Sequence, residues 1–240
     1  MDSPHRWGRG QLKRLRVYHI VATGVPAKAA AIDNLEAMAH IPFNGDHYIG
    51  EEIQKLVVRF KVQTIIETGT WSAHSTREFA KLAPKVFTID ATHEHLIGEF
   101  GPEAVAELEA DNVGVILGDS SQLLPPLLGS QQTKYPALFY LDAHGGGANG
   151  SNVNPLLEEL DAIGREAACR DRCVICIHDF LVPGETWGYN GGDWGRGFEP
   201  LSYGLIAEKL PIIYPAGHGS YYNRKAAGCQ RGIIYIHPRE

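Results

Sequence analysis

The stretch TIIETGTWSAHST, residues 64–76, joins a short apolar run to a glycine turn and then to the start of a helix-length stretch. It opens a series of five apolar runs, each of which ends on a polar or acidic residue. The runs are TIIETG (64–69), KVFTID (85–90), VGVILGD (113–119), ALFYLD (137–142) and CVICIHD (173–179). Because they are continuous rather than alternating, they predict strands that helices cover on both faces.

Amphipathic stretches of helix length separate these runs, at Ser72 to Lys81, Pro102 to Ala110 and Val153 to Ala168. Repeated strand-then-helix units predict an α/β domain with a parallel sheet. After a helix from about Leu201 to Lys209, we expect IIY (212–214) and RGIIYIH (231–237) to pair as a C-terminal antiparallel hairpin.

The first 60 residues differ from this pattern. Broken helical periodicity at Ala27 to Ala39 and Glu51 to Phe60 predicts a helical cap over residues 1–60, as part of the same domain as residues 61–240. Five basic side chains against one acidic residue in the first sixteen positions suggest a solvated arm or a contact between subunits of a homo-oligomer. An anion-binding role for this arm is the alternative.

The length, composition and net charge of the chain exclude some classes of function. A chain of 240 residues that is 44% hydrophobic is long enough for one large core. Its net charge of -6 argues against general nucleic-acid binding. The chain has neither a membrane-spanning apolar stretch of ~20 residues nor the apolar region of a signal peptide, so we expect a cytoplasmic protein without membrane contact.

The five strand ends define one candidate site, because ligands of open parallel sheets bind outside the carboxyl ends of the strands. Gly69 allows a tight turn where a helix begins, and Asp90 ends the next strand 21 residues later. That spacing is typical of an acidic residue that binds ribose hydroxyls. A single glycine in place of GxGxxG cradles a pyrophosphate poorly, so a nucleoside without phosphate fits better.

On these residues the chain resembles the S-adenosylmethionine-dependent methyltransferases. ETGTWSAHST (67–76) is similar to their first motif, FTID (87–90) to their second, and LGDSSQLLPPL (117–127) to the segment that packs against adenine. The resemblance implies a Rossmann-like, doubly wound, mostly parallel seven-stranded sheet, with the C-terminal hairpin and the N-terminal helical cap. It implies contacts to S-adenosylmethionine from Glu67, Gly69, Thr70, Ser75, Asp90, Asp119, Ser120 and Asp142.

Asp142 and the pair His178-Asp179 end neighbouring strands. IHDFLVPG (177–184) resembles the second metal motif of metal-dependent O-methyltransferases, both the catechol type and the group of macrolide-sugar O-methyltransferases and cephalosporin hydroxylases. The resemblance implies a divalent ion, Mg, Mn or Fe, on these three residues. His178 stands where a carboxylate is usual, and imidazole suits Mn, Fe or Zn better than Mg.

The catalytic residues expected from this resemblance are Asp142, His178 and His144. Catechol-type enzymes carry a lysine base where this chain has Gly145, and His144 is the nearest proton acceptor. The Gly-rich loop 183–200 is expected to be a substrate lid whose Trp187, Tyr189 and Trp194 contact a small-molecule acceptor. A flexible insertion without a function is the alternative. That acceptor is expected to offer a hydroxyl, as in a sugar, a phenol or a natural-product intermediate.

Three other functions compete with methyl transfer. A metallohydrolase could use Asp142, His144, His178 and Asp179 to activate water, and a catalytically silent scaffold could bind a nucleoside. Cys169, Cys173 and Cys176 match the C-x3-C-x2-C spacing of radical enzymes with an iron-sulfur cluster. Residues three apart on a strand point to opposite faces, which favours buried thiols instead.

Overall fold

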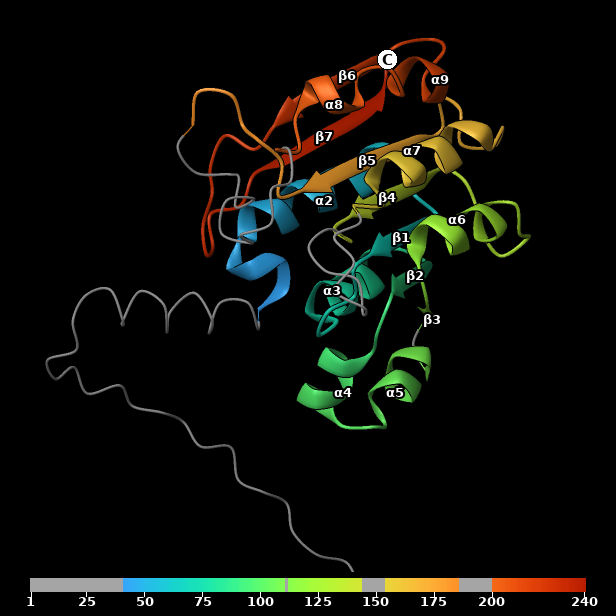
Figure 1. Ribbon diagram of the computed structural model, residues 1–240, viewed down its shortest axis with the longest axis vertical. Coiled ribbons are helices and arrows are strands. Elements are labelled where there is room, and N and C mark those ends of the chain that lie inside the picture. Colours follow the sequence, from blue (N-terminus) through green and yellow to red (C-terminus); the bar gives the residue numbers. More distant parts are fainter. Residues whose placement is uncertain (1–40, 111, 144–153, 186–199) are drawn as a thin grey trace, which may run out of the picture.

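The computed structural model describes residues 41–110, 112–143, 154–185 and 200–240. These residues form a seven-stranded sheet of order β3-β2-β1-β4-β5-β7-β6 (Figure 1). The strands are β1 (Thr64–Thr68), β2 (Lys85–Asp90), β3 (Val113–Leu117), β4 (Ala137–Leu141), β5 (Cys173–His178), β6 (His218–Tyr222) and β7 (Ile233–Pro238). The first five run parallel, and β7 pairs antiparallel with both β5 and β6. The doubly wound, mostly parallel sheet predicted from the sequence is confirmed.

The strand order places a switch point between β1 and β4. From β1 the chain moves outward through β2 to β3, and it then returns to build β4 on the other side of β1. Thr68 and Leu141 are partners in the β1–β4 register, so the loops that follow these two strands diverge from the same edge. A crevice at such a point is where ligands of this sheet type bind.

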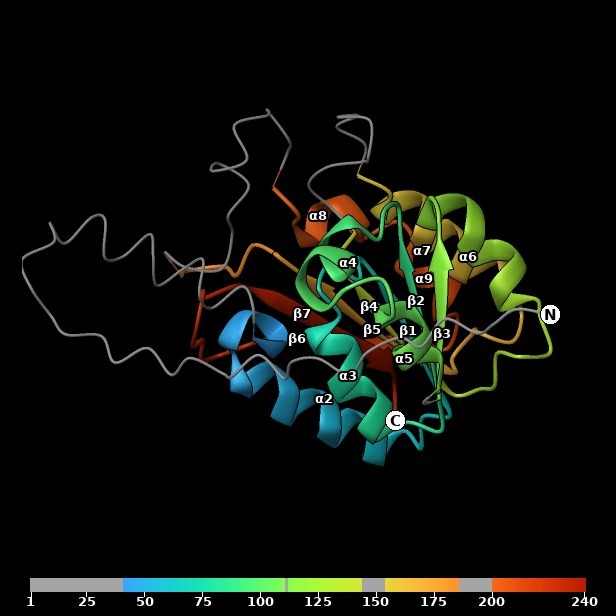
Figure 2. The same ribbon diagram turned by 90° about the horizontal axis from the view of Figure 1, so that it is seen from below.

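Helices cover both faces of the sheet (Figure 2). Alternate side chains of β1 enter different cores: Ile65 packs with residues of the helices on one face, and Ile66 packs with those on the other. One face carries α2 (His47–Arg59), α3 (His74–Leu82) and α5 (Ala104–Ala110), while the other carries α6 (Ser120–Leu128), α7 (Leu156–Arg165), α8 (Tyr203–Ile206) and α9 (Leu210–Ile213). The remaining helix, α4 (Glu94–Phe100), follows β2.

The predicted C-terminal hairpin is correct for RGIIYIH and wrong for IIY. Ile212 and Ile213 belong to α9, which has Pro211 in its first turn and whose buried Ile213 packs into the core. The partner of β7 is HGSYY, residues 218–222, an edge strand whose side chains are only partly buried. An edge strand needs no continuous apolar run, and for this reason the sequence pattern did not reveal it.

The helix expected at Glu51 to Phe60 is present and starts four residues earlier, as α2. Asp46 caps it, because its side chain accepts a hydrogen bond from the Tyr48 backbone N–H at 3.0 Å. Ile49 and Ile53 pack in the same core as β1. Residues 1–40, which include the helix expected at Ala27 to Ala39, lie outside the described residues. None of the described helices has the length and apolar character that crossing a membrane requires.

Candidate active site

The turn that follows β1 brings two strand ends into contact. Gly69 has φ +87°, and a Cβ there would lie 2.6 Å from the backbone oxygen of Asp142. The close approach of the end of β4 therefore requires a glycine at this position, whether or not a ligand also binds there. Trp71 and Ala73 in the same turn also have positive φ, 48° and 58°. Left-handed conformations of such residues cost roughly 1–2 kcal/mol each, and strain of this kind concentrates at ligand sites.

Hydrogen bonds between buried hydroxyl groups and the Glu67 carboxyl group hold this turn in place. The Glu67 carboxyl group accepts hydrogen bonds from Thr76 Oγ1 at 2.5 Å and from Thr88 Oγ1 at 2.7 Å. Because Thr88 uses its one proton on Glu67, Thr70 donates to Thr88 across 2.6 Å. Burial raises the pKa of Glu67 to about 8, against the effect of these bonds. Glu67 and Thr70 thus hold the turn in place, and their contact with a cofactor stays a prediction.

Asp90 is fixed beside the turn. Its Oδ2 accepts from the Trp71 backbone N–H at 2.8 Å, and its Oδ1 accepts from that of Thr92 at 3.0 Å. Each oxygen keeps a lone pair for a further donor. Trp71 and Leu117, the β3 register partner of Asp90, are 48% and 59% exposed. A carboxylate flanked by exposed apolar side chains suits the ribose and base of a nucleoside.

Two more predicted cofactor residues begin α6. Asp119 caps this helix, because its Oδ1 accepts from the Ser121 backbone N–H at 2.9 Å. Ser120 is buried and faces Glu159 of α7, whose pKa burial raises to about 7 in spite of the nearby Ser120 and Thr68 hydroxyls. Thr68 Oγ1 and Glu159 Oε1 are buried and have no hydrogen-bond partner among the residues that the structure describes.

Ser75, also predicted to contact the cofactor, accepts a hydrogen bond from the Phe43 backbone N–H at 3.0 Å. It thereby ties the start of α3 to the short helical turn η1 (Pro42–Gly45). This contact is structural, and a role for Ser75 toward the cofactor stays a prediction.

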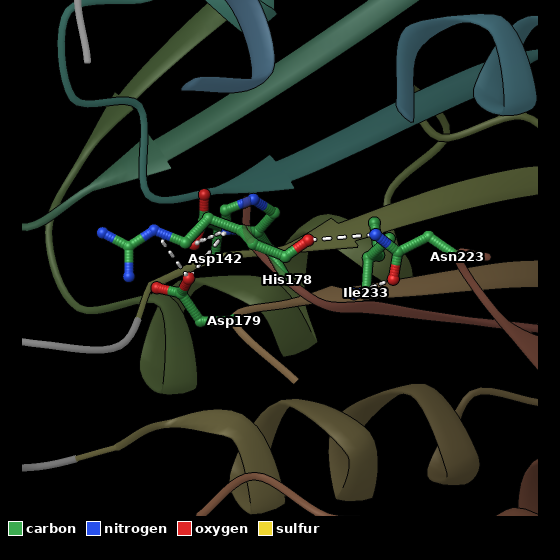
Figure 3. A network of polar contacts seen from close by, with 6 residues as sticks. Asp142, His178, Asp179, Asn223 and Ile233 are labelled. Atoms are coloured by element: carbon green, nitrogen blue, oxygen red, sulfur yellow. Dashed lines mark hydrogen bonds and ion pairs between the residues drawn. The ribbon is translucent and has the colours of Figure 1, made fainter. Parts of the chain in front are cut away.

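The three predicted metal ligands lie together, as Figure 3 shows. His178 Nδ1 is 3.1 Å from Asp142 Oδ1 and 3.6 Å from Asp179 Oδ1. One ligand atom from each residue lies within 4.8 Å of the other two. Asp179 has φ +52°, a conformation that aspartate tolerates better than most residues and that places its carboxylate beside His178. We name Asp142, His178 and Asp179 the DHD cluster.

His178 is fully buried within this cluster. Burial lowers the pKa of its imidazole, but the Asp142 and Asp179 carboxylates outweigh this and raise the pKa above its usual value. Its Nε2 is buried and has no hydrogen-bond partner among the residues that the structure describes. Two carboxylates and an imidazole nitrogen at this spacing fit a divalent transition metal such as Mn or Fe.

Arg231 is a neighbour of the DHD cluster that the sequence reasoning missed. Its Nε lies 3.5 Å from Asp179 Oδ1. The antiparallel register explains the contact: His178 pairs with Ile233, and the Phe180 backbone N–H donates to the Gly232 carbonyl at 3.0 Å. No local signal in the sequence marks Arg231, because its place depends on how β7 pairs with β5.

Four predicted residues, His144, Trp187, Tyr189 and Trp194, lie outside the described residues. The cysteines are described and carry no shared cluster. Cys169 and Cys173 are buried in one core, whereas Cys176 is buried in the core on the opposite face of the sheet. Burial raises the pKa of the Cys169 thiol to about 12. Thiols on opposite faces cannot ligate one iron-sulfur cluster.

No protein-family model matches the chain, and no curated protein sequence matches it either. Solved structures do. An O-methyltransferase from Bacillus cereus in complex with SAH superimposes with a TM-score of 0.55 at 20% identity, over 88% of each chain. The O-methyltransferase TomG from Streptomyces achromogenes, involved in tomaymycin synthesis and in complex with SAM, gives 0.51 at 16% identity, over 80% of this chain and 79% of that one.

A third structure, a candidate O-methyltransferase from Klebsiella pneumoniae, gives a TM-score of 0.52 at 18% identity over 91% of this chain and 92% of that one. At sequence identities this low, the superpositions show a shared fold and not a shared activity, because one fold hosts many activities. The chain therefore has the Rossmann-like fold of these O-methyltransferases.

Proposed function

We propose that the protein transfers the sulfonium methyl group of S-adenosylmethionine to a hydroxyl oxygen of a small molecule, with the help of a divalent ion. The observation that carries the proposal is the close packing of Gly69 against the backbone of Asp142. It joins the turn beside Asp90, which suits a nucleoside, to the DHD cluster, which suits a metal. The same edge of the sheet would thus offer a cofactor side and an acceptor side.

Each residue set has its own task in this proposal. Asp90 accepts hydrogen bonds from the ribose hydroxyls, and the rigid turn from Gly69 to Ala73 orients the methionine portion. The DHD cluster holds the ion, which when bound lowers the pKa of an acceptor hydroxyl. His144 accepts the hydroxyl proton while the methyl carbon leaves sulfur and bonds to oxygen. The main contributions to rate are alignment of the two reactants and exclusion of water.

A metallohydrolase would also use the DHD cluster. A hydrolase, however, has no use for the strained turn after β1. It also has no use for the fixed Asp90 carboxylate between exposed Trp71 and Leu117. These features favour the methyltransferase.

A transfer assay tests the proposal. Protein is incubated with S-adenosylmethionine labelled in the methyl group, a panel of sugars, phenols and other hydroxylated molecules, and Mn²⁺, Mg²⁺ or chelator. We expect label in an acceptor product with Mn²⁺ and much less with chelator. Asp142→Asn should behave like the chelated wild type, whereas Asp161→Asn, which changes a carboxylate of α7 that pairs with Lys209 at 2.7 Å, should not. Release of acceptor hydrolysis products without methylation would favour the hydrolase instead.

A further inference from the structure

Glu67 is a buried carboxyl group to which the proposed reaction assigns no task. It is only 1% exposed. Thr76 Oγ1 and Thr88 Oγ1 both donate to the same oxygen, Oε2, at 2.5 Å and 2.7 Å. Neither bond uses Oε1, which can therefore carry a proton while Oε2 accepts both hydroxyl groups. Both partners are neutral, so neither supplies the positive charge that a buried carboxylate needs.

Glu67 also senses charge at the site. Burial raises its pKa to about 8 against the effect of its two hydrogen bonds, and the charges of Asp142 and Asp90 raise it further. Hydrogen bonds of 2.6 Å and 2.7 Å lead from Thr70 in the turn through Thr88 to Glu67. A positive charge placed beside Asp142 and Asp90 acts in the opposite direction and lowers the pKa of Glu67.

The elements β2, β4 and α3 surround Glu67. β2 ends on Asp90, and β4 contributes Tyr140, the register partner of Glu67, and then leads to Asp142. α3 contributes the Thr76 hydroxyl. Burial holds the pKa of Tyr140 well above its usual value, so this side chain stays neutral at physiological pH. The ionised neighbours that act on Glu67 most strongly are thus Asp142 and Asp90.

The two forms of the cofactor differ in the property that Glu67 senses. S-Adenosylmethionine carries a sulfonium charge, and S-adenosylhomocysteine lacks both the methyl group and that charge. A unit charge at roughly 10 Å, in an effective dielectric of about 20, shifts the pKa of a carboxyl group by about one unit. Other charges around Glu67 act on it with either cofactor, so they cancel when the two are compared.

We propose that Glu67 lets the site distinguish S-adenosylmethionine from its demethylated product: sulfonium binding releases the Glu67 proton to solvent, and Glu67 regains a proton after methyl transfer. This rests on the proposed function. When the methyl carbon bonds to the acceptor oxygen, the electron pair of the S–C bond stays on sulfur, which becomes neutral. Glu67 ends each cycle as it began, and the proton released overall is that of the acceptor hydroxyl.

This linkage gives the preference between the two cofactors a pH dependence. At pH 6 Glu67 keeps its proton with either cofactor, and at pH 9 it is ionised with both. The ratio of S-adenosylmethionine affinity to S-adenosylhomocysteine affinity should therefore rise about tenfold between these values, the factor that corresponds to one pKa unit.

Calorimetry counts the protons. The full chain is titrated with S-adenosylmethionine and, separately, with S-adenosylhomocysteine at pH 7.5, with chelator present so that no metal ion takes part. Each titration is run in phosphate and in Tris, whose ionisation enthalpies differ, and the difference in heat gives the protons released. We expect about half a proton more with S-adenosylmethionine, the amount that a one-unit shift from a pKa of about 8 releases at this pH.

Glu67→Gln keeps an acceptor oxygen for the two threonines and has no proton to release, so it should remove this half proton. The α-amino group of the cofactor also titrates near this pH, but it is present with the variant as well. Glu159→Gln is the matched control. Glu159 is also buried with a raised pKa, but the charges that raise it are those of Asp119 and Glu158, so its variant should keep the difference.

Two further measurements test Glu67 itself. Thr76→Val removes a hydrogen bond that lowers the pKa of Glu67, so proton release should move to higher pH. Difference infrared spectra should show the loss of a protonated-carboxyl band when S-adenosylmethionine binds to the wild type, and no such loss in Glu67→Gln. Equal thermal unfolding temperatures at pH 6, where Glu67 is protonated, establish that the variants are folded.

Two results would overturn the inference: equal proton release by the wild type with both cofactors, or a difference that Glu67→Gln leaves intact. In either case binding itself is still seen, and the proposed function stands. A folded chain that gives no heat of binding with either cofactor refutes the proposed function, and the inference falls with it.

Discussion

Asp142 Oδ1 lies 3.1 Å from His178 Nδ1, although 36 residues separate them in the chain. The sheet produces this contact, since Leu141 of β4 and Ile177 of β5 are register partners in adjacent parallel strands. The next residue of each strand therefore emerges at the same edge. The DHD cluster is thus a direct consequence of strand order.

Removal of one carboxylate should empty the proposed metal site. In Asp142→Asn, one negative ligand becomes a neutral amide, and we expect Mn²⁺ affinity to fall at least tenfold. Affinity for S-adenosylmethionine should change much less, because the amide keeps an oxygen that can accept a hydrogen bond from the cofactor. Electron paramagnetic resonance of free Mn²⁺ measures the first and calorimetry the second. Asp161→Asn is the matched control. Equal Mn²⁺ binding by wild type and Asp142→Asn would place the ion elsewhere.

The ligand set should also determine which ion is preferred. His178→Asp replaces imidazole with a carboxylate oxygen, which Mg²⁺ accepts more readily. We expect the ratio of Mn²⁺ to Mg²⁺ affinity to fall in this variant relative to wild type, in competition titrations at equal ion concentration. An unchanged ratio would mean that His178 is not a ligand.

Asp90→Ala should weaken cofactor binding by the value of a charge-assisted hydrogen bond, about 1.5–3 kcal/mol. Asp90 also holds the Trp71 backbone N–H, so Asp90→Asn is needed as a second variant that keeps an acceptor oxygen. We expect Asp90→Asn to bind S-adenosylmethionine with intermediate affinity. Glu109→Ala, on the exposed side of α5, is the control. If calorimetry gives the same affinity for all four proteins, Asp90 has no role in binding.

The buried Glu67 should make stability depend on pH. Its pKa is raised from 4.5 to about 8 by burial, so between these values the folded protein holds a proton that the unfolded chain has released. The free energy of unfolding must then fall as pH rises through this window, by on the order of 3–5 kcal/mol. Urea unfolding from pH 5 to 8.5 measures the slope.

Glu67→Gln mimics the protonated side chain and should flatten this slope while it keeps the acceptor for Thr76 and Thr88. Glu159→Gln should flatten a smaller part of it, because the pKa of Glu159 is raised only to about 7. Curves for Glu67→Gln and wild type that run parallel across the whole range would show that Glu67 is ionised in the folded protein.

His144→Ala should reduce turnover about 10²–10⁴-fold without loss of cofactor affinity, since the proposed role of His144 exists only during proton transfer. Single-turnover rates from pH 6 to 9 and calorimetry separate the two quantities. Full activity of the variant throughout this range would assign the proton to another acceptor.

The parallel part of the fold could be predicted from the sequence because its signals are local. Continuous apolar runs marked β1 to β5, and the polar residue at the end of each run marked the site edge. The same logic predicted that Asp142 and His178 meet. These predictions needed only the rule that carboxyl ends of parallel strands share an edge.

The remaining features depend on tertiary contacts. The helical pattern around Leu156 does not reveal that Glu159 is buried and Leu157 only partly so, because the burial of each depends on how α7 packs against the sheet. β6 is defined by its pairing with β7 rather than by its own residues. Arg231 reaches Asp179 only through the β5–β7 register, which is not encoded by any spacing along the chain.

Calorimetric titration of the purified full chain with S-adenosylmethionine, with and without Mn²⁺, tests the central claim most directly. We predict binding at one site per chain in both conditions, because the proposed cofactor contacts at the turn after β1 and at Asp90 do not require the ion. Binding should weaken in Asp90→Ala and persist in Asp142→Asn. Absence of binding to the folded wild type in both conditions would contradict the account.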